Sequence, residues 1–155
     1  MPGAADRFLA RARELGIDIR PRRFPDGTRT AADAAAAVGC EVAQIVKSLV
    51  FIADGQPVLV LTSGARRVDE TKLAAATHAD TVRKATADEV RAATGYAIGG
   101  TPPFGHDAPL EVLCDEHLLE HGAVWAAAGT PMDVFDLSPA DLVAASGARV
   151  IDIAS

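Results

Sequence analysis

The chain lacks the features of membrane-spanning, secreted and metal-binding proteins. No apolar run approaches the roughly 20 residues that cross a bilayer, and the N-terminus has no basic-then-apolar signal pattern. The two cysteines, Cys40 and Cys114, lie far apart without a neighbouring Cys or paired His. This spacing argues against a zinc site and against a disulfide framework. We therefore expect a cytosolic protein in which both cysteines are small buried hydrophobic residues.

An excess of positive charge is also missing. The formal net charge is −6, which argues against a broad nucleic-acid surface, because Lys and Arg supply most of the sequence-independent affinity for phosphate. The basic residues gather in three short groups, around Arg22 and Arg23, around Arg66, and at Arg83-Lys84. Groups this short are more often solvated faces than binding sites. Any nucleic-acid contact should be small and local.

The common catalytic motifs are absent as well. The chain has no Gly-x-Ser-x-Gly elbow, no phosphate loop of the Gly-x-x-x-x-Gly-Lys type and no His-Glu-x-x-His helix. His117 and His121 are four residues apart and could share a helix face, but two nitrogens without a third ligand favour surface histidines. We expect neither a metal nor a cofactor.

What is present is a regular succession of helix and strand signals within one domain, residues 1–155. The composition, 49% apolar and 23% charged, is that of a globular protein. Apolar spacing, caps and breakers predict helices at 6–15, 31–38, 70–76, 87–94, 116–120 and 139–146. The N-cap candidates are Thr30, Asp69, Thr86 and Ser138. They predict strands at 17–24, 45–52, 58–61, 82–85, 110–113, 124–127, 132–137 and 149–153, with a hairpin turn at Asp54-Gly55. The order favours a mixed α/β (α+β) domain with a mixed sheet and peripheral helices.

One loop, Tyr96 to His106, stands out from this pattern. Three glycines and two prolines between Gly99 and Gly105 exclude a helix or a regular strand. Such a loop can bring bare backbone amides against a ligand, or it can be a rigid turn with only a packing role. His106 at its end is a candidate general base or a structural residue.

A lysine interrupts the predicted strand 45–52. Period-two geometry puts Lys47 on the same face as Ile45, Leu49 and Phe51. A lysine among apolar neighbours either extends from a strand end to water or points into a cavity where its charge has a partner. The pattern leaves both alternatives open.

Four segments, in this order, resemble the YbaK-type aminoacyl-tRNA deacylase family, which is related to the editing domain of bacterial prolyl-tRNA synthetases. They are Gln44–Phe51, Gly99–His106, Trp125–Pro131 and Asp136–Leu142. The resemblance implies a partly barrel-like sheet of about six or seven strands. It also implies hydrolysis of the ester between a wrong amino acid and the terminal adenosine of a tRNA.

The resemblance assigns roles to particular residues. The family's active lysine matches Lys47, and its Gly-x-x-x-Pro loop matches Gly99 to Pro103. We expect backbone amides of the loop to stabilise the oxyanion, while a vicinal ribose hydroxyl orients or activates the water. The residues expected to act in catalysis are Lys47, Gly99, Gly100 and Thr101. Those expected to bind substrate are Ile45, Ser48, Tyr96, Pro102, Pro103, Phe104, Gly105 and His106, and those expected to bind tRNA are Arg22, Arg23 and Arg66.

The amino acid and the tRNA stay open. Members specific for cysteinyl-tRNA often carry a serine before the loop proline, whereas Pro102 stands there in this chain. Cysteine, alanine, serine and threonine, on tRNA-Pro or a related tRNA, therefore all remain candidates. The partners expected are the aminoacyl-tRNA 3′ end, with prolyl-tRNA synthetase or another synthetase left open, and no membrane.

Two rival interpretations remain. One is a non-catalytic accessory module that binds a tRNA end or a synthetase. The other is a hydrolase of a different small acyl ester in which His106 and Asp107 act together as a general base.

Overall fold

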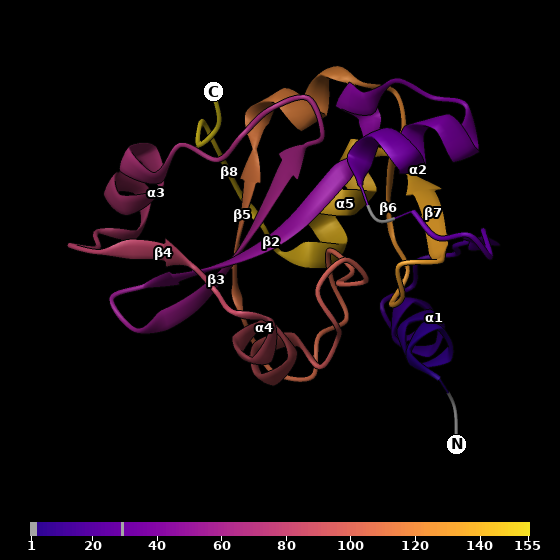
Figure 1. Cartoon of the computed structure of the whole chain (residues 1–155), viewed down its shortest axis with the longest axis horizontal. Helices are drawn as coiled ribbons and strands as arrows, with labels where there is room; N and C mark the ends of the chain where they lie inside the picture. The colour runs from indigo at the N-terminus through magenta and orange to yellow at the C-terminus, as the bar shows by residue number, and fades with distance from the viewer. Residues whose placement is uncertain (1–2, 29) are drawn as a thin grey trace.

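A computed structural model describes residues 3–28 and 30–155 (Figure 1). Its centre is a five-stranded sheet with the order β4-β2-β3-β5-β8. The strands are β2 (Val46–Ala53), β3 (Gln56–Ser63), β4 (Val82–Lys84), β5 (Glu111–Asp115) and β8 (Arg149–Ile151). Strand β2 is antiparallel to both of its neighbours, whereas β3, β5 and β8 are parallel. The sheet is therefore mixed, as expected.

Strands β2 and β3 form the predicted hairpin. Asp54 and Gly55 at its tip have φ angles of 48° and 80°, the left-handed conformations that a two-residue turn of this kind requires. On its other side, β2 pairs with β4 only through Phe51–Ala53. The first half of β2 is therefore left without a partner strand from this sheet on that side.

A smaller sheet with the order β1-β7-β6 packs beside the first. Its strands are β1 (Arg22–Arg23), β6 (Val124–Ala127) and β7 (Asp133–Leu137). Strands β6 and β7 are antiparallel neighbours, as predicted. In the described part of the chain, a single parallel bridge between Ile45 and Trp125 joins the two sheets. The described residues thus form sheets of three and five strands, rather than one sheet of six or seven.

The predicted edge strand at 17–24 is much shorter in the structure. Only Arg22 and Arg23 form a ladder, opposite Val134 and Asp133 of β7. Pro21 supplies no amide hydrogen, which stops the pairing before Arg22.

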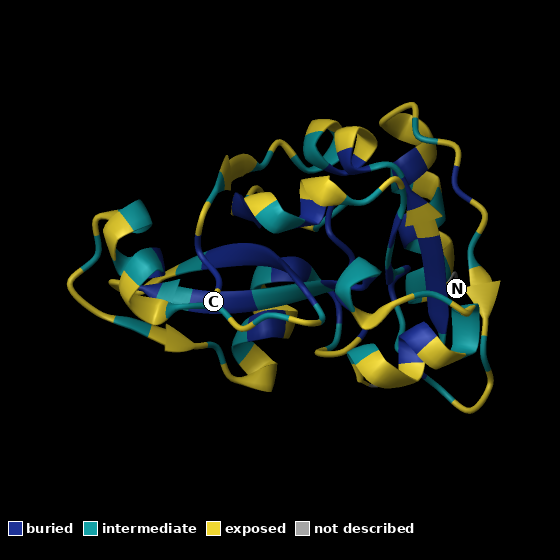
Figure 2. Cartoon of the chain, turned by 90° about the horizontal axis from the view of Figure 1, so that it is seen from above, coloured by how far each residue is buried: buried dark blue, intermediate teal, exposed yellow. Residues whose placement is uncertain are grey.

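Five α-helices lie outside the sheets in the described part of the chain. Figure 2 shows exposed residues on the outer faces of the helices. They are α1 (Ala4–Glu14), α2 (Ala31–Val38), α3 (Glu70–Thr77), α4 (Ala87–Thr94) and α5 (Pro139–Ser146). Helices α2 to α5 begin at the N-caps that the sequence predicts, Thr30, Asp69, Thr86 and Ser138, whose side chains each accept a backbone N–H. The predicted helix 116–120 is a 3₁₀ helix, η2 (Glu116–Glu120), and a second, η1 (Val42–Gln44), precedes β2.

The core lies on both faces of the larger sheet. On one face, the rings of Phe8, Phe104 and Phe135 pack against one another with centroids 5.1–5.9 Å apart. On the other face, Phe51 packs in a cluster with Leu73 of α3. Because Phe104 belongs to the first cluster, the second half of the glycine-proline loop is fixed in the core.

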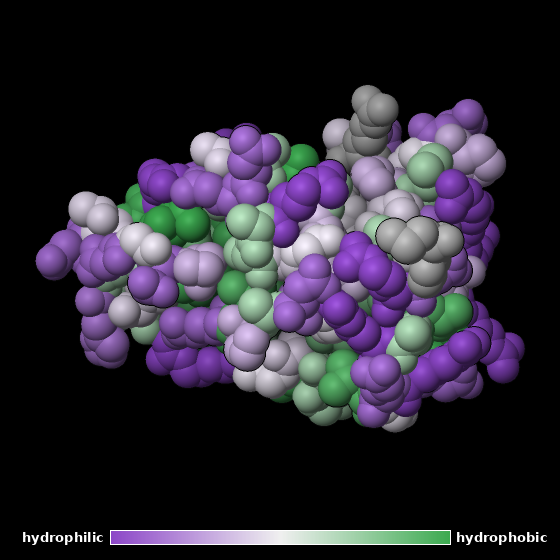
Figure 3. Space-filling model, turned by 90° about the horizontal axis from the view of Figure 1, so that it is seen from below, coloured by the Kyte–Doolittle hydropathy of each residue, from purple (hydrophilic) through white to green (hydrophobic). Residues whose placement is uncertain are grey.

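The surface mixes polar and apolar residues, and the face in Figure 3 carries only small, separate apolar patches among hydrophilic side chains. Among the described residues, no helix has the length and apolar character to span a membrane. Cys114 is fully buried, as predicted, and burial raises the pKa of its thiol to about 12. Cys40 is only half-buried, so the prediction of a buried residue was wrong there.

Candidate active site

A cavity of about 640 Å³ lies between the two sheets. After the parallel bridge between Ile45 and Trp125, β2 and β6 run in the same direction, but no further bridge joins them among the described residues. The strands therefore separate, and the space between them is closed by α2 and by the loop that follows Tyr96. The described residues that line it are Thr28, Thr30, Ala31, Ala34, Val38, Ile45, Val46, Lys47, Ser48, Leu49, Ile98, Gly99, Thr101, Trp125, Ala126, Ala127, Pro131 and Val134. This volume is in the range of small-molecule sites.

The cavity meets strand β2 at its edge. All five residues from Ile45 to Leu49 line it, although successive side chains of a strand point to opposite faces. A cavity can contact both faces of β2 and the backbone between them only if it lies at the edge of the strand. This edge is the part of β2 that β4 leaves unpaired.

Lys47 is half-buried in the wall of this cavity, and its Nζ donates a hydrogen bond to the backbone oxygen of Arg66 at 2.6 Å. The pKa of Lys47 is lowered, first by burial and then by the positive charges of Lys84 and Arg67. The ammonium therefore lies at the cavity with a neutral partner and no carboxylate. This is the cavity position that the sequence left open as one of two alternatives.

The first half of the glycine-proline loop reaches the same cavity. Ile98, Gly99 and Thr101 line it, and the Thr101 hydroxyl donates to the Ala97 carbonyl at 3.0 Å. Gly100 lies behind them against the backbone of Thr130, where a Cβ atom would lie only 2.7 Å from the Thr130 Cα. Glycine at this position is what allows the loop to pack so closely against the segment before β7.

The second half of the loop points away from the cavity. Tyr96, Pro102, Pro103 and Phe104 are buried in the protein interior, and none of the predicted substrate-binding residues from Pro102 to His106 lines the cavity. The Tyr96 hydroxyl donates to the Gly105 carbonyl at 3.1 Å. For Tyr96 and for residues 102–106, the structure gives a packing role, and substrate contact stays a prediction.

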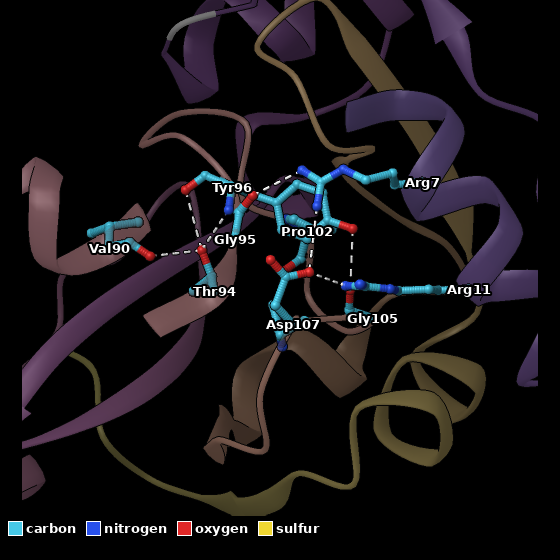
Figure 4. A network of polar contacts seen from close by, with 10 residues as sticks. Arg7, Arg11, Val90, Thr94, Gly95, Tyr96, Pro102, Gly105 and Asp107 are labelled. Atoms are coloured by element: carbon cyan, nitrogen blue, oxygen red, sulfur yellow. Dashed lines mark hydrogen bonds and ion pairs between the residues drawn. The ribbon is translucent and has the colours of Figure 1, made fainter. Parts of the chain in front are cut away.

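Helix α1 holds both ends of this loop, as the sticks in Figure 4 show. Arg7 donates to the Gly95 carbonyl at 2.9 Å, and Arg11 donates to the Gly105 carbonyl at 2.8 Å. Asp107 forms an ion pair with Arg11 at 2.6 Å and a longer one with Arg7 at 3.4 Å. We name Arg7, Arg11 and Asp107 the loop clamp. The sequence pattern did not indicate it, because nearly a hundred residues separate its partners.

The clamp removes one of the rival mechanisms. His106 Nε2 is bonded to the Pro102 carbonyl at 2.8 Å, and burial lowers the pKa of His106. The Asp107 carboxylate pairs instead with the arginines of α1. The prediction that His106 and Asp107 act together as a general base is therefore wrong: among the described residues no hydrogen bond joins the two side chains.

The three arginines predicted to bind tRNA differ in their surroundings. Arg22 lies over the rings of Phe24 and Trp125, with its guanidinium carbon 5.2 Å and 5.7 Å from their centroids. Arg23 forms an ion pair at 3.0 Å with Asp133, whose side chain is buried. Arg66 uses its backbone oxygen to hold Lys47. Arg22 and Arg66 thus contact residues that line the cavity, whereas Arg23 forms an ion pair within the smaller sheet.

Asp115, His117 and Asp152 bring potential metal ligands within 4.8 Å of one another. Each already has a protein partner: Asp115 accepts the Ile153 amide and contacts His117 Nδ1, and Asp152 pairs with Lys72. These contacts tie β8 and the C-terminal segment to η2 and α3. The group therefore carries no argument for a metal.

The cavity has a defined chemical character. Among its described lining residues there is no Asp, Glu, His or Cys, and the polar groups are Lys47, hydroxyls, the Trp125 indole and main-chain atoms. Such a site stabilises developing negative charge with a cation and with amides, but supplies no side-chain base. The fold and site thus define an α/β domain with a small-molecule cavity that offers a cation and hydrogen-bond donors to a ligand.

Comparison with known proteins places this domain in a family. Residues 25–145 match the aminoacyl-tRNA editing domain. The chain belongs to this family. The resemblance seen in the sequence is thereby confirmed.

Individual relatives agree with this assignment. A solved structure described as that of a candidate trans-editing enzyme for prolyl tRNA synthetase superposes with a TM-score of 0.94 and 43% identity, covering 100% of this chain and 99% of that one. An uncharacterized Bacillus subtilis protein, YwhH, is 32% identical over 132 residues, which are 84% of this chain and 83% of that protein.

The chain is also similar to part of a synthetase. The proline–tRNA ligase of Nitratidesulfovibrio vulgaris (strain DP4) is 35% identical over 107 residues, 69% of this chain. The chain spans less than a fifth of the ligases that it matches, 13% of one and 18% of another.

Proposed function

We propose that the chain removes a small amino acid from a mischarged tRNA, most directly tRNA-Pro, by hydrolysing the ester at the terminal ribose. One observation carries the proposal. Lys47 and the loop residues Gly99 and Thr101 come from distant segments of the chain and line one cavity, whose described lining residues include no Asp, Glu or His. This is the set of groups that ester hydrolysis assisted by the substrate's own ribose requires.

The reaction needs few protein groups. The oxygen of a water attacks the ester carbonyl carbon, whose oxygen takes up the negative charge. The bond from that carbon to the ribose oxygen then breaks, the ribose oxygen takes a proton, and free amino acid and deacylated tRNA leave. Main-chain amides and the Lys47 ammonium stabilise the oxyanion, and a vicinal ribose hydroxyl orients the water.

The walls of the cavity are mostly apolar. Ala31, Ala34 and Ala126 line it together with larger side chains such as Leu49 and Trp125. Such walls suit uncharged side chains, and alanine, cysteine, serine and threonine are the substrates that we propose to test first. A pocket of this kind separates neighbours that differ by one methylene by only about 1–3 kcal/mol, so more than one of them is expected to react.

The acidic chain is compatible with a tRNA substrate. An enzyme that grips only the terminal nucleotide and its amino acid needs few phosphate contacts. Arg22 and Arg66, beside the cavity wall, are the residues that we assign to the acceptor end. Similarity to proline–tRNA ligases supports tRNA-Pro as the acceptor and a synthetase as an optional partner.

The test is release of amino acid from a panel of tRNAs. Alanine, cysteine, serine and threonine on tRNA-Pro are compared with the same amino acids on their own tRNAs and with prolyl-tRNA-Pro. We expect release from one or a few mischarged tRNA-Pro species, with prolyl-tRNA-Pro spared. No release from any of them, together with measurable binding of tRNA or a synthetase, would favour the non-catalytic accessory module.

A further inference from the structure

The edge of β2 that faces the cavity includes backbone groups that no strand of the described residues pairs. Strand β4 ends its pairing at Phe51, and the last contact on that side is the Ala85 amide, which donates to the Val50 carbonyl at 3.0 Å. At the other end, Ile45 bridges to Trp125 of β6. Between these two contacts lies Ser48, in the wall of the cavity.

Two hydrogen bonds establish the direction of the Ser48 backbone groups. The Val50 carbonyl points away from β3, because it accepts from Ala85, whereas the Ile45 carbonyl points the other way and accepts from Gly64 at 2.8 Å. In an antiparallel strand the N–H and C=O of one residue share a side, and the side alternates along the chain. Ser48, two residues before Val50, therefore directs both its N–H and its C=O to the open edge.

The exposure of Ser48 agrees with this direction. Its Oγ is fully buried, yet the residue as a whole remains partly accessible and lines the cavity. The accessible part is therefore Cβ and the main chain, not the hydroxyl. A main-chain donor and acceptor at a cavity wall that no strand of the described residues pairs are costly unless water or a ligand satisfies them.

The charge of the cavity defines what such a pair would bind. Lys47 is the one charged side chain among the described lining residues, and it is a cation. An aminoacyl ester brings an α-ammonium group, which needs acceptors and finds no carboxylate here. It also brings an ester carbonyl oxygen, which needs a donor. These two groups flank one carbon atom, as the N–H and C=O of one residue do.

We propose that Ser48 holds the aminoacyl group of the substrate as a one-residue β-bridge. The α-ammonium donates to the Ser48 carbonyl, and the Ser48 N–H donates to the ester carbonyl oxygen. This is the reciprocal pair of bonds that two directly opposite residues of antiparallel strands exchange. The bridge reads the α-amino acid unit itself, whatever its side chain, and its N–H acts on the oxygen that becomes the oxyanion.

The inference rests on the proposed function and adds a substrate contact that side-chain motifs do not indicate. Its test uses two variants. Ser48→Ala removes only the buried hydroxyl. Ser48→Pro also removes the N–H. Because this N–H points away from β3, the hydrogen bonds between β2 and β3 are kept. Proline is tolerated in a strand at such an edge position. Thermal melting of both variants shows whether each is folded.

With the mischarged tRNA that the wild type cleaves best, Ser48→Pro should have a kcat about a hundredfold below that of Ser48→Ala, which keeps the N–H. Equal activity of the two folded variants would overturn the bridge while leaving the deacylase function intact. Absence of activity in the wild type would instead refute the proposed function.

A second measurement does not depend on the folding of Ser48→Pro. The ¹⁵N-labelled wild-type protein is titrated with two stable amides, 3′-alanylamino-3′-deoxyadenosine and its propionyl analogue, which lacks the amino group. We expect the Ser48 amide to shift downfield with both compounds. The Leu49 ¹⁵N, which senses a bond to the Ser48 carbonyl, should shift only with the alanyl compound, which should also bind about tenfold more tightly. Unchanged Ser48 and Leu49 signals in the presence of bound ligand would overturn the proposal.

Discussion

The Nζ atom of Lys47 lies 2.6 Å from the backbone oxygen of Arg66. Lys47 is in β2, directly opposite Thr62 of β3, and Arg66 follows the turn that ends β3. The chain therefore reverses so that a main-chain carbonyl holds the ammonium by one of its three donors. The other two have no protein partner among the described residues. A neutral partner orients the charge without cancelling it, which is what stabilisation of an oxyanion requires.

Replacement of this lysine by an isosteric apolar residue should separate activity from folding. Lys47→Met keeps the length of the side chain and removes the charge, so we expect deacylation to fall by about a hundredfold or more. The melting temperature should stay or rise, because the half-buried cation is no longer desolvated. Single-turnover deacylation and thermal melting measure the two effects.

Lys84→Met is the matched control. Lys84 is a cation on the neighbouring strand β4 and is not among the residues that line the cavity. Its loss should leave the rate within about twofold, and by removing a repulsion it should raise the pKa of Lys47. Equal losses in the two variants would show that general positive charge, rather than Lys47, drives the reaction.

The protonation of Lys47 gives a second prediction. Burial and neighbouring cations lower its pKa in the folded protein below about 10.4, the value of an ordinary lysine. Between the folded and the unfolded pKa, the unfolded chain binds more protons, so the free energy of unfolding rises with pH in that window. The charged form costs stability at all lower pH values.

The chain has three lysines, at positions 47, 72 and 84. NMR of protein labelled with ¹³Cε-lysine can therefore follow each of them, and each signal is assigned by its loss when that lysine is replaced. We expect the Lys47 signal to titrate below the ordinary range. A Lys47 titration at or above about 10.4 would contradict the burial of its ammonium.

Local signals explain how much of the fold was predictable. The Asp54-Gly55 turn and the caps at Thr30 and Ser138 are encoded by neighbouring residues, and each is present as predicted. The parallel pairing of β3 with β5 joins segments about fifty residues apart, and no local signal specifies it. The division into two sheets depends on packing in the same way, as does the limit of β1 to two residues.

The site was predictable to a similar degree. The alternation around Lys47 placed it in a strand among apolar neighbours, and the glycines of the loop indicated a close approach of backbone. That Lys47 and Gly99 line one cavity became visible only in three dimensions. The sequence also treated the loop as one binding unit, whereas Phe104 and Tyr96 fix its second half in the core. Composition cannot distinguish glycines that face a ligand from those that face a helix.

The loop clamp gives a third prediction. Arg11→Met removes the bond to the Gly105 carbonyl and the ion pair with Asp107, both of which are partly exposed. We expect a loss of about 1 kcal/mol in stability. Deacylation should fall roughly three- to tenfold, because a looser loop holds its amides less accurately toward the cavity.

Arg13→Met is the control on the same helix. Arg13 is exposed and has no side-chain hydrogen bond or ion pair among the described residues. Chemical denaturation and deacylation should both stay close to wild type. If Arg11→Met also leaves kcat unchanged while stability falls, the clamp supports the fold without positioning the loop.

A fourth prediction tests the close packing behind the loop. The Cβ atom of Gly100→Ala would lie 2.7 Å from the Thr130 Cα and 2.8 Å from its carbonyl carbon, and neither backbone atom can rotate away. We expect a cost of about 1–3 kcal/mol and at least a tenfold loss of activity as the loop shifts. Gly122→Ala, whose Cβ meets nothing within 4 Å, should change neither. Full activity of Gly100→Ala would mean that the loop is not held in this position during catalysis.

The last prediction separates the arginines near the cavity. Arg22 stacks on Trp125, a lining residue, and Arg66 holds Lys47 through its backbone. Neither guanidinium group has a carboxylate partner among the described residues, so both can bind phosphate. Arg22→Gln with Arg66→Gln should raise the KM for aminoacyl-tRNA several-fold and lower the salt dependence by roughly one phosphate contact per residue, while kcat changes little.

Arg23→Gln should behave differently from that pair. It leaves the buried Asp133 carboxylate without its ion-pair partner, so its main effect should be a lower melting temperature. Arg91→Gln, on helix α4 away from the cavity lining, controls for the loss of a positive charge. Deacylation is measured against tRNA concentration at two salt concentrations for every variant. If the double variant at Arg22 and Arg66 keeps the wild-type KM and salt slope, the acceptor end approaches the cavity from another side, and the basic groups are solvated faces after all.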